Sequence, residues 1–353
     1  MVLVAHVAEG TRFADRLWAS LGGFGVDIFF VLSGYIITLR FLKERQRSGS
    51  VNLRAFYIRR AFRILPLVMA YLSALCLLSL FIALPDLHVS EILGALFFFR
   101  NYQYAAHPQG MWTSHFWSLS IEEHFYLFWP VILLTLRSRR ALWLALCGAV
   151  SCALWRMYAL AYPAAWLPSL LPGSGAARSM GRTDMRCDGL LLGCALAILL
   201  ARPQLRAFLL RNVPKETPLL LGVPLLLNLV HTDAKPTLAS YLLFTAILAC
   251  TLVVEEGLVW KALNLRPLAW VGVVSYSLYV WQQVFLLHPV GATPLGRLAA
   301  FPLNLLCVFA VASLSYYFLE QPMIALGKRL LRRKGAAPIT TVPVKSHPTH
   351  DFT

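Results

Sequence analysis

The segment His115–Pro130, HFWSLSIEEHFYLFWP, places two glutamates and two histidines inside an aromatic and aliphatic run that stays apolar through Leu136. At about 1.5 Å rise per residue, a helix over 115–136 is long enough to cross a bilayer. A charged side chain at mid-membrane costs about 2.5–3.5 kcal/mol on insertion scales. Glu122 and Glu123 therefore indicate a protein interior that supplies polar partners or a wet cavity.

The composition of the chain is that of a membrane protein. Of its residues 58% are apolar and only 14% are charged, and the mean hydropathy is +0.65, which excludes an ordinary soluble domain. Residues 1–8 are interpreted as the end of a first helix whose earlier part is absent, and 92–99 as a half-helix too brief to cross. The sequence thus predicts an all-α integral membrane protein, a polytopic bundle of about ten transmembrane helices with a truncated first one. The other spans are expected near 23–42, 64–84, 115–136, 140–161, 184–201, 217–231, 238–254, 267–288 and 298–320.

The net charge of +16 follows the topology and does not indicate a nucleic-acid partner. Basic residues gather in short loops on one side of the alternating spans, as the positive-inside rule requires, so both termini are expected in the cytoplasm. Residues 1–334 form the expected transmembrane domain, and 335–353 an expected disordered cytoplasmic tail. The seven cysteines show neither metal-ligand nor disulfide spacing and are interpreted as small buried residues.

Two polar groups stand near the start of the chain. Asp27 lies near the outer end of the second expected span, and Gly34 on the same helical face admits either a ligand or a neighbouring backbone. The stretch RAFYIRRAFRILP carries three guanidiniums, Arg59, Arg60 and Arg63, which suit a phosphate-bearing ligand or lipid headgroups equally well. Pro66, which lacks a backbone N–H, is expected in the first turn of the span that follows.

The later spans offer further candidates. His115, Ser118 and Glu122 share one helical stripe, suited to an oriented base, an ion pair or interhelical polar contacts, while Glu123 points about 100° away. Arg186 stands between two aspartates that are expected to neutralise it locally, either as a structural lock or as a binding group. Glu320 closes the last span and is expected to pair with an arginine. The two aspartates around Arg186 are Asp184 and Asp188. A further stripe of Ser275, Tyr279 and Gln282 offers hydroxyl and amide groups suited to a sugar or a pantetheine arm.

These segments together resemble the acyltransferase 3 family, bacterial membrane proteins that acylate cell-surface glycans. The resemblance covers nearly the whole chain and keeps the family's order of motifs. The matching pieces are His6, GVDIFFVLSGY at 25–35, RRAFRILP at 59–66, HFWSLSIEEHFYLFWP at 115–130, RCDGLLLG at 186–193, SYSLYVWQ at 275–282 and FLEQP at 318–322.

The resemblance implies a ten-helix bundle in the bacterial inner membrane that takes an acyl group, usually acetyl, from acyl-CoA on the cytoplasmic side. The acceptor is a hydroxyl of a surface polysaccharide, a lipid-linked sugar or a glycosylated metabolite. No cofactor is expected beyond this donor. His6 resembles the family's first-helix histidine, acting as base or transient acyl carrier, and Glu122 and Glu123 resemble its acidic pair. The candidate contacts for donor and acceptor are Asp27, Ser33, Arg59, Arg60, Arg63, His115, Ser118, Arg186, Asp188, Tyr279, Gln282 and Glu320.

Two departures from the family are expected. An arginine that normally precedes the histidine by about three helical turns would lie upstream of Met1, and only a short tail takes the place of the hydrolase-like domain of some relatives. Transfer must then be completed by the bundle or by a separate partner. Two other readings stay open, a polytopic transporter or flippase and an inactive family member, although no inverted repeat supports transport.

Overall fold

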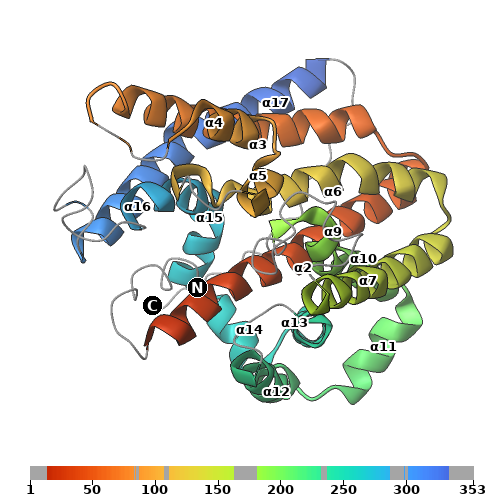
Figure 1. The fold of residues 1–353 in the computed structure, drawn as a ribbon. Helices are drawn as coiled ribbons and strands as arrows, with labels where there is room; N and C mark the ends of the chain where they lie inside the picture. Colours follow the sequence, from red (N-terminus) through yellow and green to blue (C-terminus); the bar gives the residue numbers. More distant parts are fainter. Residues whose placement is uncertain are drawn as a thin grey trace, which may run out of the picture.

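The structure is a computed structural model, and it describes residues 14–82, 84, 87–106, 111–162, 181–231, 237–286, 298 and 301–333. Within these ranges every regular element is a helix, as the hydropathy pattern predicts. Helix α2 (Ala14–Ser48), drawn in red, runs through the middle of the bundle (Figure 1). The other helices are arranged around it, so residues along α2 reach several different partners.

Helix α10 (Asp188–Leu200) packs closely along α2, and two glycines make this approach possible. A Cβ atom added at Gly34 would overlap the carbonyl of Leu190, and one added at Gly193 would overlap the carbonyl of Val31. The small-residue face predicted at Gly34 is therefore confirmed as a helix contact rather than a ligand contact.

Helix α3 (Leu53–Leu78) begins well before the predicted span at 64–84. The side chain of Asn52 caps it by accepting a hydrogen bond from the Ala55 N–H at 2.9 Å. The expectation that Pro66 occupies the first turn is wrong, because Pro66 lies inside the helix. Hydropathy misses the first three turns because they are rich in arginine, whereas the backbone continues as helix while the long side chains carry their charges to water.

A short helical excursion separates α3 from the next long helix. Helices α4 (Val89–Leu96) and α5 (Arg100–Ala106) are too brief to cross a membrane, as predicted for 92–99. Arg100 is fully buried and pairs with Glu91 at 3.3 Å. The 3-10 helix η1 (Met111–Thr113) then leads into α6 (Phe116–Thr135), which is followed by α7 (Ser138–Ala161).

The middle of the chain contains two bent helix pairs. After α9 (Thr183–Arg186), helix α10 turns by 93° into α11 (Pro203–Asn212). Helix α12 (Thr217–His231) packs on α13 (Leu238–Val254), which turns by 86° into α14 (Gly257–Leu263).

The last part of the chain returns to α3. Helix α15 (Arg266–Leu286) packs on α16 (Leu303–Ser315), which continues through the π-helix η4 (Tyr316–Glu320) into α17 (Gln321–Arg333). Helix α17 lies alongside α3 (Figure 1). The prediction that the last span ends at Glu320 is wrong, because Pro322 falls in the first turn of α17, where no intrahelical N–H is needed.

In the described ranges, fewer helices than the ten predicted qualify as membrane spans by length and composition. Four helices in the described ranges qualify, and up to six if each bent pair counts as one span, so the ten-span count is not confirmed. Helices α6 and α15 contain 20 and 21 residues but carry polar side chains that lower their hydropathy. The expected first helix at 1–8 and the tail at 335–353 lie outside the described residues. The qualifying helices are Phe24–Ser48, Leu53–Leu78, Ser138–Ala161 and Leu303–Arg332.

Candidate active site

A cavity of about 190 Å³ opens between α2, α3, α6 and α15. It brings together six of the predicted candidate residues, which come from four different helices. Those six are Ser33, Arg59, Arg60, Arg63, Glu122 and Ser275, and the lining is completed by Phe29, Ile36, Ile37, Arg40, Phe56, Ile64, Leu119, Tyr126 and Tyr276.

The charge of the cavity is strongly positive. Four guanidiniums line it, and Glu122 is the single carboxylate among the lining residues. Arg40 and Arg63 are exposed, whereas Arg59 and Arg60 are half-buried, so the arginines run from the rim into the interior. Like charges held together repel one another, and such a group is stabilised by an anion that fits between them.

Glu122 lies at the inner end of this arrangement with only 1% of its surface exposed. The hydroxyl of Tyr126 donates a hydrogen bond to Glu122 Oε1 at 2.5 Å, and the guanidinium of Arg60 stacks 3.7 Å from the centre of the Tyr126 ring. Ser33 lines the same cavity and is close enough to act on the Glu122 side chain. The carboxyl group is therefore held in one orientation by the Tyr126 hydrogen bond and has a neighbouring cation, the polar partners that an acidic group inside a membrane needs.

Glu123 belongs to a different surface of α6. It is half-buried, it does not line the cavity, and its Oε1 has no hydrogen-bond partner among the described residues. The predicted rotation of about 100° between the two glutamates places them on different surfaces of α6, while Arg60 and Glu122 both act on Glu123 as nearby charges.

A second cluster lies one to two turns from Glu122 toward the start of α6. His115 precedes the helix, is buried, and packs against Tyr71 and Tyr279 with ring centres 5.4 and 5.6 Å away. The Tyr279 hydroxyl hydrogen-bonds to Ser118 and also donates to the carbonyl of His115 at 2.5 Å. The predicted stripe of His115, Ser118 and Glu122 thus contacts α15 at one end and the cavity at the other.

A third polar group lies on the other side of α2. Arg186 donates to Asp27 at 2.6 Å, and the Tyr241 hydroxyl donates to the same carboxylate oxygen at 2.8 Å. Arg156 donates to Asp188 at 2.7 Å. All four charged side chains are buried, and none of them lines the cavity. This paired network, defined as Asp27, Arg156, Arg186, Asp188 and Tyr241, ties together α2, α7, α9, α10 and α13.

The predicted local neutralisation of Arg186 by Asp184 and Asp188 is wrong. Asp184 accepts hydrogen bonds from Arg182 at 2.8 Å and from the Trp155 indole at 2.7 Å, so it is not the partner of Arg186. Asp184 and Asp188 each stand two residues from Arg186, and residues two apart on a helix do not face each other, so local spacing does not bring them together.

Two predicted residues of the last spans lie apart from these groups. Glu320 is buried in the π-helix and accepts a hydrogen bond from Ser277 at 2.9 Å, whereas the expected ion pair with an arginine does not form in the described ranges, where Arg63 acts on Glu320 only as a nearby charge. Gln282 is buried, and its amide has no hydrogen-bond partner among the described residues. His6 lies outside the described residues.

Sequence reasoning missed three polar residues that line the cavity, Arg40, Tyr126 and Tyr276. Arg40 looked like an ordinary basic residue near the end of a span, Tyr126 like part of an aromatic run, and Tyr276 was overlooked beside Ser275. A helical spacing signal was available for two of them. Arg40 follows Ser33 by seven residues and Tyr126 follows Glu122 by four, so each lies on the face of a residue already selected.

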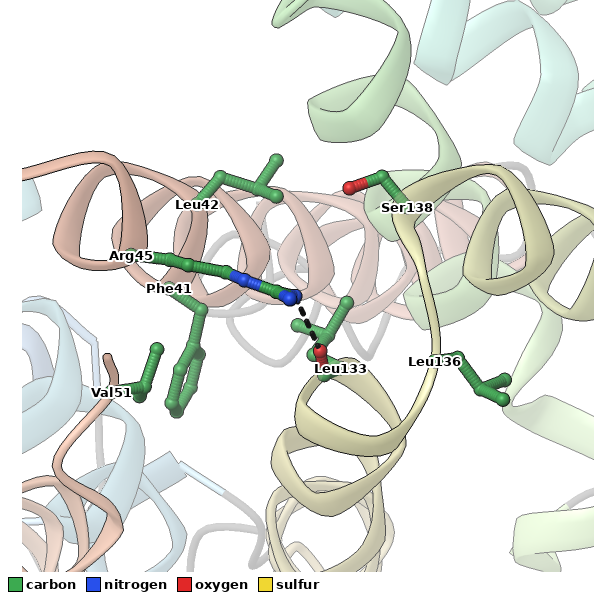
Figure 2. Close-up of a pocket in the computed structure, with 7 residues that line it drawn as sticks. All are labelled: Phe41, Leu42, Arg45, Val51, Leu133, Leu136 and Ser138. Carbon is green, nitrogen blue, oxygen red and sulfur yellow. Dashed lines mark hydrogen bonds between the residues drawn. The ribbon is translucent and has the colours of Figure 1, made fainter. Parts of the chain in front are cut away.

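A second hollow contains Arg45, an arginine of α2 that has a structural role (Figure 2). It measures only about 10 Å³ and lies between the ends of α2 and α6 and the start of α7. Arg45 donates to the carbonyl of Leu133 at 3.5 Å, which satisfies one of the last carbonyl groups of α6. Room for at most one water molecule excludes this hollow as a substrate site.

The described part of the chain thus combines helices long and apolar enough to cross a membrane with a cavity lined by four arginines and one glutamate. The acyltransferase domain family matches residues 1–320, and the chain belongs to this family of acyltransferase enzymes, as its motifs predict.

Curated relatives support the assignment. The chain is 29% identical to the peptidoglycan O-acetyltransferase OatA of Listeria monocytogenes over 92% of its own length and 54% of the relative's. It is 29% identical to a putative peptidoglycan O-acetyltransferase of Bacillus subtilis and 28% identical to a putative O-acetyltransferase of Staphylococcus aureus, in each case over 90% of the chain. The chain therefore spans about half the length of the curated relatives it matches. No solved structure matches the chain.

Proposed function

We propose that this chain transfers an acetyl group from acetyl-CoA to a hydroxyl of a cell-surface glycan. The observation that carries the proposal is the cavity in which four arginines lead to one buried, hydrogen-bonded glutamate. Acetyl-CoA combines several phosphate charges with a slender thioester arm, and the cavity combines a cationic rim with a narrow interior. Shape and charge therefore match a donor of this kind.

The size of the cavity supports partial entry of the donor. Pockets that enclose a whole small-molecule ligand measure about 300–1,000 Å³. At about 190 Å³ the cavity is smaller than that, so it suits the pantetheine arm while the nucleotide remains at the rim. Burial of the arm excludes water from the thioester, which protects it from hydrolysis before the acceptor arrives.

The reaction needs a base for the acceptor hydroxyl. His6 takes this role in the proposal, and Glu122 orients and stabilises it as the charge on the imidazole develops. The hydroxyl proton passes to the histidine, the oxygen attacks the thioester carbonyl, and the carbon–sulfur bond breaks. Coenzyme A leaves as a thiolate toward the arginines. A route through a transient acyl-histidine uses the same groups in two steps.

The acceptor is proposed to approach from the opposite side. His115, Ser118 and Tyr279 offer hydroxyl groups and aromatic faces at the start of α6, which suit a sugar. Peptidoglycan is the first acceptor to test, because relatives carry it in their names. Other surface polysaccharides and lipid-linked sugars have the same chemistry. The inner membrane, with both ends of the chain in the cytoplasm, gives the arginines access to acetyl-CoA.

The test uses the chain in lipid nanodiscs with acetyl-CoA carrying a radiolabelled acetyl group and with peptidoglycan fragments. Arg60→Ala removes a guanidinium from the cavity, and Arg54→Ala removes one from an exposed position on the same helix that does not line it. We expect label to reach the acceptor, with a loss of at least about tenfold in kcat/KM for Arg60→Ala and almost none for Arg54→Ala. Equal effects of the two variants, or no incorporation of label into any glycan hydroxyl, would reject the proposal.

A further inference from the structure

Arg40 is the lining arginine that no sequence motif identified, and its surroundings differ from those of Arg45 on the same helix. It is exposed at the cavity rim and makes no hydrogen bond or ion pair with any residue in the described ranges. Its charged neighbours are themselves cations, since Arg59, Arg60 and Arg63 all act on it electrostatically. A guanidinium held against three others gains no local stabilisation from its position.

Arg45 provides the internal comparison. It lies five residues further along α2, about 140° around the helix, and donates to the Leu133 carbonyl (Figure 2). Both residues satisfy the positive-inside rule at the same end of the helix. Topology therefore explains a cation at either position, but it does not explain why Arg40 faces a cavity already lined by three guanidiniums.

The position of Arg40 along α2 defines what it can reach. Ser33, which lines the cavity together with Glu122, lies seven residues earlier on the same helical face, roughly 10 Å away along the axis. A thioester placed beside Ser33 and Glu122 has its pantetheine arm running along this face toward the rim. The first charged group that follows the arm in coenzyme A is the phosphate at its 4′ end.

We propose that Arg40 binds this phosphate, the one that joins the pantetheine arm to the nucleotide, and so sets the depth to which the donor enters. The inference rests on the proposed function, because it assumes a coenzyme A thioester as donor. Arg40 then acts as a specificity residue for a phosphorylated arm. The terminal 3′-phosphate of the nucleotide lies outside the cavity and does not contact Arg40.

Binding measurements on the whole chain in phosphatidylcholine nanodiscs test this without requiring turnover. Isothermal titration calorimetry compares pantetheine, 4′-phosphopantetheine, dephospho-coenzyme A and coenzyme A against the wild type, Arg40→Gln and Arg45→Gln. We expect the wild type to bind 4′-phosphopantetheine roughly 10- to 100-fold more tightly than pantetheine, the range of a charge-assisted hydrogen bond. Arg40→Gln should remove most of this preference, Arg40→Lys should restore part of it, and Arg45→Gln should keep all of it.

Several outcomes would overturn the inference. One is an undiminished preference in Arg40→Gln, and another is an effect of Arg40→Gln confined to the difference between coenzyme A and its dephospho form. A third is loss of the preference for 4′-phosphopantetheine when phosphatidylglycerol is added to the nanodiscs, because the arginines would then bind lipid phosphates. Arg40-dependent binding without acetyl transfer would reject the proposed function and keep this site, whereas transfer without Arg40 dependence would do the reverse.

Discussion

Both sides of α2 face arginines and acidic residues, but these charges are paired on one side and unbalanced on the other. On one side, the paired network contains two arginines and two aspartates that are all buried and matched one to one. On the other side, four guanidiniums face a cavity lined by one carboxylate. Pairing neutralises the first group and leaves it no net attraction for an ion. The second group has an excess of positive charge and lines an open cavity. Those two properties together distinguish a binding site from a set of structural ion pairs.

The largest effect on activity is expected from Glu122→Gln. The amide keeps the shape of the side chain and can still accept a hydrogen bond from Tyr126, but it loses the charge that orients the base. We expect acetyl transfer to fall by about 10²- to 10⁴-fold, measured as kcat in nanodiscs. Glu123→Gln is the matched control, since Glu123 does not line the cavity, and its loss should stay within about tenfold. Equal losses would mean that the two glutamates act together.

The largest effect on stability is expected in the paired network. Asp188→Ala leaves Arg156 buried without its partner, which costs about 3–5 kcal/mol in the free energy of unfolding. The ion pair between Arg206 and Glu255 is the matched control, because both side chains are exposed, at 54% and 63%, so Arg206→Ala should cost about 1 kcal/mol or less. Thermal unfolding in detergent, followed by size-exclusion chromatography, ranks the two. A smaller shift for Asp188→Ala than for Arg206→Ala would contradict the structural role of the network.

A smaller loss is expected at the contact between α2 and α10, on the side of the paired network. In Gly193→Ala the added methyl group overlaps the carbonyl of Val31, so α2 and α10 must separate, and we expect about 1–3 kcal/mol of destabilisation. Gly272→Ala adds the same group to α15, where nothing lies within 4 Å, and should be neutral or stabilise by up to about 1 kcal/mol. Melting temperatures of the two variants test the contact, which is absent if they are equal.

The smallest effect is expected from salt, and it separates the two regions directly. Raising the ionic strength from about 0.01 to 0.15 M shortens the Debye length from about 30 to 8 Å, which screens the exposed rim arginines. The KM for acetyl-CoA should rise severalfold over this range, while the melting temperature, which depends on the buried pairs, should change little. A KM independent of salt would show that the rim does not attract the donor.

Much of the fold was predictable from hydropathy because a helix that crosses a membrane satisfies its own backbone hydrogen bonds within one segment. Each of the apolar runs from 23–42 to 298–320 contains a helix in the described ranges. The boundaries were less predictable. The arginine-rich start of α3 and the basic end of α17 do not look like membrane segments, although their backbone hydrogen bonds continue. Side chains that carry charge to water change the hydropathy without changing the helix.

The candidate site was predictable only where a local pattern pointed to it. Arg59, Arg60 and Arg63 share a helix turn, and Glu122 stood out in an apolar run, so sequence alone selected them. The partners of Arg186 show the limit of local spacing. Asp184 and Asp188 are its neighbours in the sequence, yet Asp27 binds it from 159 residues away. The spacing of seven residues between Ser33 and Arg40 indicates a shared helical face but no cavity, and the tertiary structure is needed to show that Arg40 faces open volume while Arg45 does not.

By itself the sequence determined that this chain forms apolar helices, belongs among acyltransferases and carries more cations than its carboxylates can neutralise. Those properties depend on composition and on short-range periodicity, which a linear reading contains. Only the tertiary structure decided which arginines are paired and which face open volume. Ion pairs form between side chains that distant helices bring within about 3 Å of one another. Helix packing sets those distances: α2 packs against α10 on one side, and α3, α6 and α15 surround the cavity on the other.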